Sequence, residues 1–130
     1  MLIPKEYALT AAQRRLDRAY KNWLHEDMAC CLSGRTDVQL AHCGDVTTGK
    51  GMAIKSAPWT QLPLSFPLHL AEEANRNAFW EMAIGESPLP WAERLWDCFT
   101  TGDKESGQLL LADMRDMANR EFLASILERA

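Results

Sequence analysis

The apolar residues of the amino-terminal part recur at the spacing of a helix. They fall every three or four positions on one stripe: Leu16, Tyr20, Trp23 and Leu24. Thr10 precedes the run and is a residue type that caps helix amino termini. His25 at the far end suits the helix dipole without any catalytic role. The pattern therefore predicts a first helix over about residues 10–25.

The next part of the chain changes to short apolar runs separated by turn residues. Residues 28–43 predict two short strands around the turn sequence SGRTD, which would form a β-hairpin. Residues 44–51 predict a loop, because three glycines and two threonines give them no apolar period. Prolines interrupt residues 56–67, so we expect that segment to be extended or irregular.

Helical spacing returns in the second half. A helix is predicted from about 68 to 84, with a buried stripe of Leu70, Ala74, Phe79 and Ile84. Another is predicted over about 88–100, with Ser87 as its cap and Gly102 beyond its end.

The last predicted helix covers about 106–128 and opens at Ser106. It carries a long apolar stripe: Leu109, Leu110, Met114, Met117, Phe122, Ile126 and Leu127. We expect this stripe to cover the first helix, and the alternative is contact with a second copy of the chain. The elements together predict an α+β, mostly helical fold: a β-hairpin flanked by about four helices in a single domain over residues 1–130.

Composition narrows the classes of function. Of the 130 residues 47% are hydrophobic and 25% charged, and no apolar run reaches the ~20 residues of a membrane span. The amino terminus lacks the pattern of a secretory signal, so we expect a cytoplasmic protein without membrane contact. The net charge of −4 disfavours a dedicated nucleic-acid binder, despite a local cluster of Arg14, Arg15, Arg18 and Lys21. No CxxC pair occurs among the four cysteines, which favours free thiols over a structural zinc site.

Several stretches together resemble one known family. They are ACCLSG (29–34), LAH (40–42), KGMAIKSAPW (50–59), PLSFPLHLAEE (63–73), FWEMAI (79–84) and WAERLW (91–96). In this order they resemble an HNH-like nuclease family of phages and prophages, whose core is a ββα-metal finger. The resemblance covers about residues 20–97 and implies a finger over about residues 26–85, between the flanking helices.

The resemblance also implies roles for individual residues. His42 would be the general base that activates a water, and Lys55 would contact a phosphate. His69 and Glu73 would hold a divalent cation (Mg²⁺, Mn²⁺, Ni²⁺ or Zn²⁺), because positions i and i+4 share one helix face. Taken singly, the same residues are typical of a structural histidine at a strand end and, with Glu72, of a solvated first helical turn.

The sequence also departs from the family's pattern. Four cysteines often clamp the finger in that family, and the corresponding positions here are Cys30 or Cys31, Ser33, Ser65 and Leu68. Gly44 replaces the family's arginine. We therefore expect no structural metal, with an apolar cluster around Leu68 holding the hairpin to the helix. The function expected is a catalytically degenerate protein in a bacterial host cell that binds another protein, for example a host defence complex. The alternative is an active metal-dependent endonuclease that cleaves DNA.

Overall fold

The computed structural model describes residues 3–4, 10–43, 54–55 and 58–129. The helices are α1 (Ala11–Asp27), α2 (Phe66–Ala74), α3 (Arg76–Ile84), α4 (Leu89–Thr100), α5 (Lys104–Met117) and α6 (Arg120–Leu127). The strands are β1 (Ile3–Pro4), β2 (Val38–His42), β3 (Ile54–Lys55) and β4 (Gln61–Ser65), and a short 3-10 helix, η1 (Pro58–Thr60), precedes β4. The predicted class, α+β and mostly helical, is confirmed.

The central hairpin is formed by β2 and β4. The two strands are antiparallel, with Val38 opposite Ser65 and His42 opposite Gln61. Both strands of the hairpin were predicted within residues 28–43. The second of them is β2, but the first was a wrong prediction. Residues 28–37 form a turn, in which the Cys30 N–H donates to the carbonyl of Arg35 and the Gly34 N–H donates to the carbonyl of Cys30. The partner of β2 is instead β4, which comes from the proline-rich segment. Pro63 can lie in β4 because proline is tolerated in a strand at a sheet edge.

The helix predicted over 68–84 is two helices. Asn75 leaves helical geometry (φ −158°, ψ 88°), and its side chain accepts a hydrogen bond from the Ala78 N–H, which caps α3. This break changes which side chains are buried. Phe79 lies in the core as expected, but Leu70 is 61% exposed, because α2 and α3 do not continue one stripe.

The carboxyl-terminal helix predicted from Ser106 is likewise two helices, α5 and α6. Asp103 caps α5, which begins earlier at Lys104, and the chain leaves helical geometry before Asn119 caps α6. Leu111, Met114, Leu123 and Ile126 are buried in the core, whereas Leu109 and Met117 are exposed. The segment thus completes the core, as predicted, although α5 packs mainly on α4 rather than on α1.

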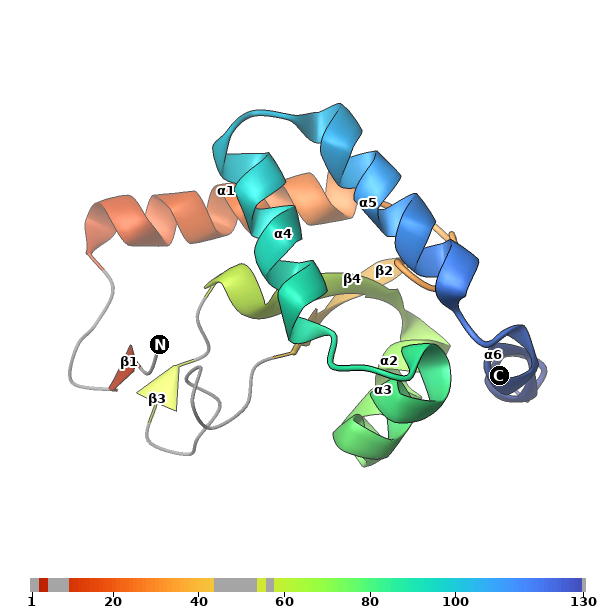
Figure 1. Cartoon of the computed structure of the whole chain (residues 1–130). Coiled ribbons are helices and arrows are strands. Elements are labelled where there is room, and N and C mark those ends of the chain that lie inside the picture. The colour runs from red at the N-terminus through yellow and green to blue at the C-terminus, as the bar shows by residue number, and fades with distance from the viewer. Residues whose placement is uncertain (1–2, 5–9, 44–53, 56–57, 130) are drawn as a thin grey trace.

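The helices form two groups around the hairpin. Figure 1 shows α1, α4 and α5 on one side of it, and α2, α3 and α6 toward the other end. In the first group α5 approaches α1 closely at Gly107, where an added Cβ would lie 2.8 Å from Trp23 Cη2. None of the helices within the described ranges is long and apolar enough to cross a membrane.

Candidate functional site

The site is built on a strand–strand–helix unit. β4 ends at Ser65 and α2 begins at the next residue, Phe66, so that no loop separates the hairpin from the helix. Pro67 in the first turn of α2 costs no helical hydrogen bond, because the N–H groups there have no partner within the helix. The direct connection places the start of α2 beside the start of β2, where Val38 lies opposite Ser65.

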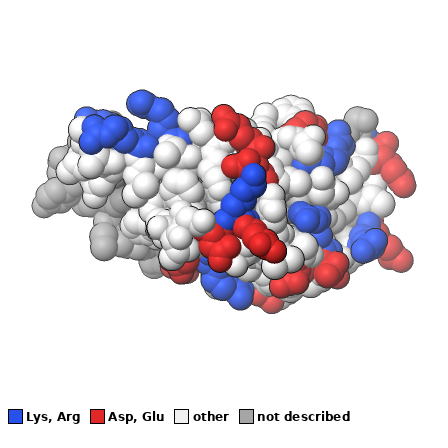
Figure 2. Space-filling model, turned by 90° about the horizontal axis from the view of Figure 1, so that it is seen from above, with Lys and Arg blue, Asp and Glu red and all other residues white. Residues whose placement is uncertain are grey.

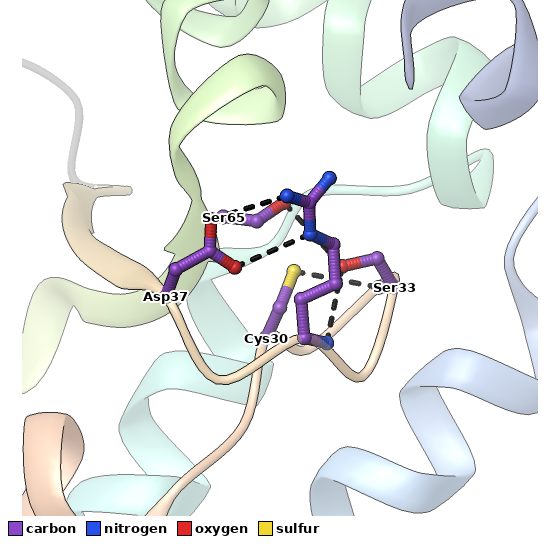
Figure 3. A network of polar contacts seen from close by, with 5 residues as sticks. Cys30, Ser33, Asp37 and Ser65 are labelled. Atoms are coloured by element: carbon purple, nitrogen blue, oxygen red, sulfur yellow. Dashed lines mark hydrogen bonds and ion pairs between the residues drawn. The ribbon is translucent and has the colours of Figure 1, made fainter. Parts of the chain in front are cut away.

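The positions that correspond to clamp cysteines in the family that the sequence resembles lie near this junction. The Ser33 hydroxyl donates to Ser65 Oγ over 3.3 Å, although the two residues are 32 positions apart. The Ser33 N–H donates to Cys30 Sγ, also over 3.3 Å. Figure 3 shows Cys30, Ser33 and Ser65 gathered at the turn that precedes β2. Leu68 follows one turn after Ser65 and is fully buried. We call these four residues the clamp junction.

The chemistry of the clamp junction does not fit a zinc ion. Neutral hydroxyls are poor zinc ligands and leucine has no donor atom. The neighbouring Cys31 does not replace them, because burial raises the pKa of its thiol well above the ordinary value and keeps it protonated. The hydrogen bond between Ser33 and Ser65 therefore connects the turn to the start of α2. Leu68 is fully buried in the same hydrophobic core as Leu62 and Leu64 of β4, and its expected role in holding the hairpin to the helix stays a prediction.

His69 and Glu73 lie together on α2, as their spacing predicts. Nε2 of His69 is 3.3 Å from Oε1 of Glu73, and Nδ1 of His69 is 2.8 Å from Oε1 of Gln39 on β2. Both neighbouring atoms are hydrogen-bond acceptors. Which ring nitrogen donates a hydrogen bond depends on the tautomer of His69. Only 15% of the His69 side chain is exposed, compared with 58% for Glu73.

His42 is placed on the same hairpin as these residues. It ends β2 opposite Gln61 and is partly exposed. It stands three positions beyond Gln39, so that about 10 Å of strand separates it from the residue that contacts His69. Within the described ranges, no three His, Cys, Asp or Glu side chains come together as a metal site.

Lys55 and the glycine loop are the remaining predicted parts of the site. The backbone of Lys55 pairs with Ile3 in the short β1–β3 ladder. The Lys55 side chain and the glycines at 49 and 51 lie outside the described residues. Their predicted contact with phosphate stays a prediction.

Glu72 is a buried charged residue for which the sequence analysis assigned no role. The alternative in which it belongs to a solvated first turn is wrong, because the residue is 0% exposed. Its Oε2 accepts hydrogen bonds from Arg76 Nε (2.9 Å) and Trp80 Nε1 (3.2 Å), so that one carboxylate connects α2 to α3 across the break at Asn75. The spacing of Glu72 and Arg76, four positions apart, was the signal available in the sequence.

Comparisons of the chain with protein-family models, curated proteins and solved structures found no match.

The surface adds one observation on charge. Figure 2 shows basic side chains gathered at the end of the molecule where α1 begins, and acidic and basic side chains interspersed elsewhere on this face. The residues of the basic end are exposed on α1: Arg14, Arg15 and Arg18.

Proposed function

We propose that the chain is a degenerate ββα-metal finger that has lost its metal clamp and acts by binding another protein. The observation that supports this most strongly is the clamp junction. Three positions taken from the resemblance, Cys30, Ser33 and Ser65, are joined by hydrogen bonds although Ser33 and Ser65 are 32 residues apart, and the fourth, Leu68, is buried one turn after Ser65. They lie where strand β4 passes directly into α2. The succession of β2, β4 and α2 is the strand–strand–helix order that the resemblance implies.

The residues at these positions favour binding over catalysis. Serine and leucine replace thiolates, so the framework is maintained by a hydrogen bond and by packing. Both ring nitrogens of His69 already have protein partners, Gln39 and Glu73, so a metal would have to displace or share one of them. A folded framework with a reduced ligand set suits a protein that presents surfaces to a partner.

Restoring the clamp tests the assignment of the finger. The combined variant Ser33→Cys, Ser65→Cys, Leu68→Cys creates two CxxC pairs with the native Cys30, which is the ligand spacing of structural zinc sites. Two thiolates on a tetrahedral zinc lie about 3.8 Å apart, given zinc–sulfur bonds of about 2.3 Å. The present separation of 3.3 Å between the two serine oxygens is close to that value.

We expect this variant to bind one zinc ion per chain and to give the absorption spectrum of tetrahedral Co²⁺–thiolate when Co²⁺ replaces zinc. The matched control adds Cys30→Ser, which removes one ligand and should weaken both signals. A variant that binds no metal, or that binds it equally well without Cys30, would contradict the finger.

A nuclease is the second candidate, and the contact between His69 and Glu73 favours it. Gln39 would hold the Nδ1 proton and orient Nε2 toward a cation shared with Glu73. His42 would accept a proton from the attacking water, and a divalent cation, when bound, would stabilise the charge on the phosphate and its leaving oxygen.

Plasmid nicking with Mn²⁺ separates the two candidates. The proposed binding function predicts no nicking by the wild type beyond that of the double variant His42→Ala/His69→Ala. The third histidine supplies a matched control, His25→Ala at the exposed end of α1. Nicking by the wild type and by His25→Ala that disappears in the double variant would establish the nuclease instead.

A further inference from the structure

An apolar groove runs along α6 on the side away from α1. Its larger part, about 670 Å³, lies between α2 and α6 and includes Phe66, Leu70, Ala71, Ile126, Leu127 and Arg129 in its lining. A smaller part, about 240 Å³, continues between α3 and α6 past Met82. Ala71, Ile126 and Arg129 line both parts, so the two hollows adjoin each other along α6. We call the two together the α6 furrow.

The rim of the α6 furrow exposes large apolar side chains. Phe66 is 50% exposed, Leu70 61% and Met82 53%. Within α2, Leu68 and Glu72 lie on the buried face, whereas Phe66 and Leu70 lie on the outer face. Apolar side chains gathered along a groove are typical of binding surfaces, since their removal from water is favourable at about 25 cal/mol per Å².

The charges along the α6 furrow indicate the kind of partner. Arg35 and Asp37 face each other in a two-pronged ion pair, with distances of 3.2 and 3.3 Å. Arg129 is exposed and has no ion pair among the described residues. The lining therefore carries an excess of one positive charge on a chain whose net charge is −4.

This excess charge disfavours a second copy of the chain as the occupant. Two furrows facing each other around a twofold axis would bring their arginines together without a free carboxylate from either lining. A helix with acidic residues beside its apolar stripe complements both features, because apolar side chains at positions i, i+3, i+4 and i+7 suit a groove between helices.

We propose that the α6 furrow is the docking site for an acidic amphipathic helix of a partner protein. The proposal rests on the proposed binding function and names its surface: Phe66, Leu70 and Met82 contact the apolar stripe of that helix, and Arg129 pairs with a carboxylate beside the stripe.

Fluorescence anisotropy with a labelled designed peptide tests the docking site. The peptide has about 16 residues, long enough to form a helix, with leucines on one stripe and glutamates elsewhere. Its partner peptide carries lysine in place of every glutamate. We expect the acidic peptide to bind the wild type more tightly than the basic one. Leu70→Glu should weaken binding of the acidic peptide about tenfold or more, and Arg129→Glu should reduce or reverse the preference for it.

The chain provides a matched control. Leu109 on α5 is also 61% exposed but lies outside the α6 furrow, so Leu109→Glu should leave binding unchanged. Equal binding of both peptides, no binding by the wild type, or equal losses in Leu70→Glu and Leu109→Glu would overturn the docking site. So would a wild-type dimer that Leu70→Glu alone converts to a monomer in sedimentation. A nuclease result from the plasmid assay would refute the proposed function and leave this measurement standing.

Discussion

The hairpin is attached to its helices in two different ways. On the side of α1 and α4 it meets large aromatic side chains around Tyr20, which is 0% exposed. The ring centroid of Tyr20 lies 4.9 Å from Trp96 and 5.0 Å from Phe99, and its hydroxyl donates to the carbonyl of Gln61 on β4. At the clamp junction, two small hydroxyls and one thiol make contacts of 3.3 Å.

The difference shows where this fold obtains its stability. A buried aromatic side chain removes 150–250 Å² or so of apolar surface from water, whereas one hydrogen bond contributes about 1 kcal/mol net. The aromatic side therefore stabilises the hairpin more than the hydrogen bonds of the clamp junction do. The hydrogen bonds at the clamp junction can be weak because the aromatic side contributes the larger share of the stability of the hairpin.

The largest expected effect comes from the aromatic side. Tyr20→Ala should lower the free energy of unfolding by about 3–5 kcal/mol, because it leaves a cavity among Trp23, Trp96 and Phe99. Tyr20→Phe retains the ring and loses only the hydrogen bond to Gln61, so a loss of about 1 kcal/mol is expected. Urea denaturation measures both. Equal losses in the two variants would mean that the hydroxyl, not the ring packing, attaches the hairpin.

Alkaline pH should lower the stability of the fold in two stages, first through Cys31 near the clamp junction and then through Tyr20 on the aromatic side. Burial raises the pKa of Cys31, beside the clamp junction, and of Tyr20 well above their ordinary values of about 8.5 and 10. The folded state therefore retains protons that the unfolded chain loses as the pH rises. Stability should decline above about pH 8.5 and more steeply above about pH 10, by at most about 1.4 kcal/mol per pH unit for each group.

Variants assign each part of this decline. Unfolding in urea between about pH 7 and pH 11 is compared for the wild type, Cys31→Ala and Tyr20→Phe. Cys31→Ala should flatten the first part of the slope and Tyr20→Phe the second. Cys98→Ala is a comparison rather than a blank, because the pKa of its less buried thiol is also raised; it should flatten the decline less than Cys31→Ala does. A profile that is the same in all four proteins would exclude both groups as the cause.

The smallest effect is expected at the clamp junction itself. Ser33→Ala removes the hydrogen bond to Ser65 and should cost about 0.5–1.5 kcal/mol. Thermal unfolding of Ser33→Ala, Ser65→Ala and the double variant measures the coupling between the two hydroxyls. A loss as large as that of Tyr20→Ala would reverse the comparison and make the clamp junction the principal attachment.

The sequence by itself determined the features that depend on neighbours within one or two turns. Thr10 caps α1 as predicted, and its side chain and that of Gln13 exchange hydrogen bonds with each other's N–H groups. The contact between His69 and Glu73 follows from their spacing on one helix. The mostly helical class follows in the same way from apolar periodicity, because each turn is stabilised by residues close in the chain.

Only the tertiary structure decided the features that join distant segments. The sequence pattern predicted a partner for β2 within residues 28–43, whereas β2 pairs with β4, of which Leu62 and Leu64 are fully buried. The break at Asn75 turns Glu72 into the core beside Trp80 and leaves Leu70 in water, which no helical period in the sequence foretells. The meeting of Ser33 with Ser65 is of the same kind. Such contacts depend on which packing of the whole chain buries the most apolar surface, and that free energy is shared among segments far apart in sequence.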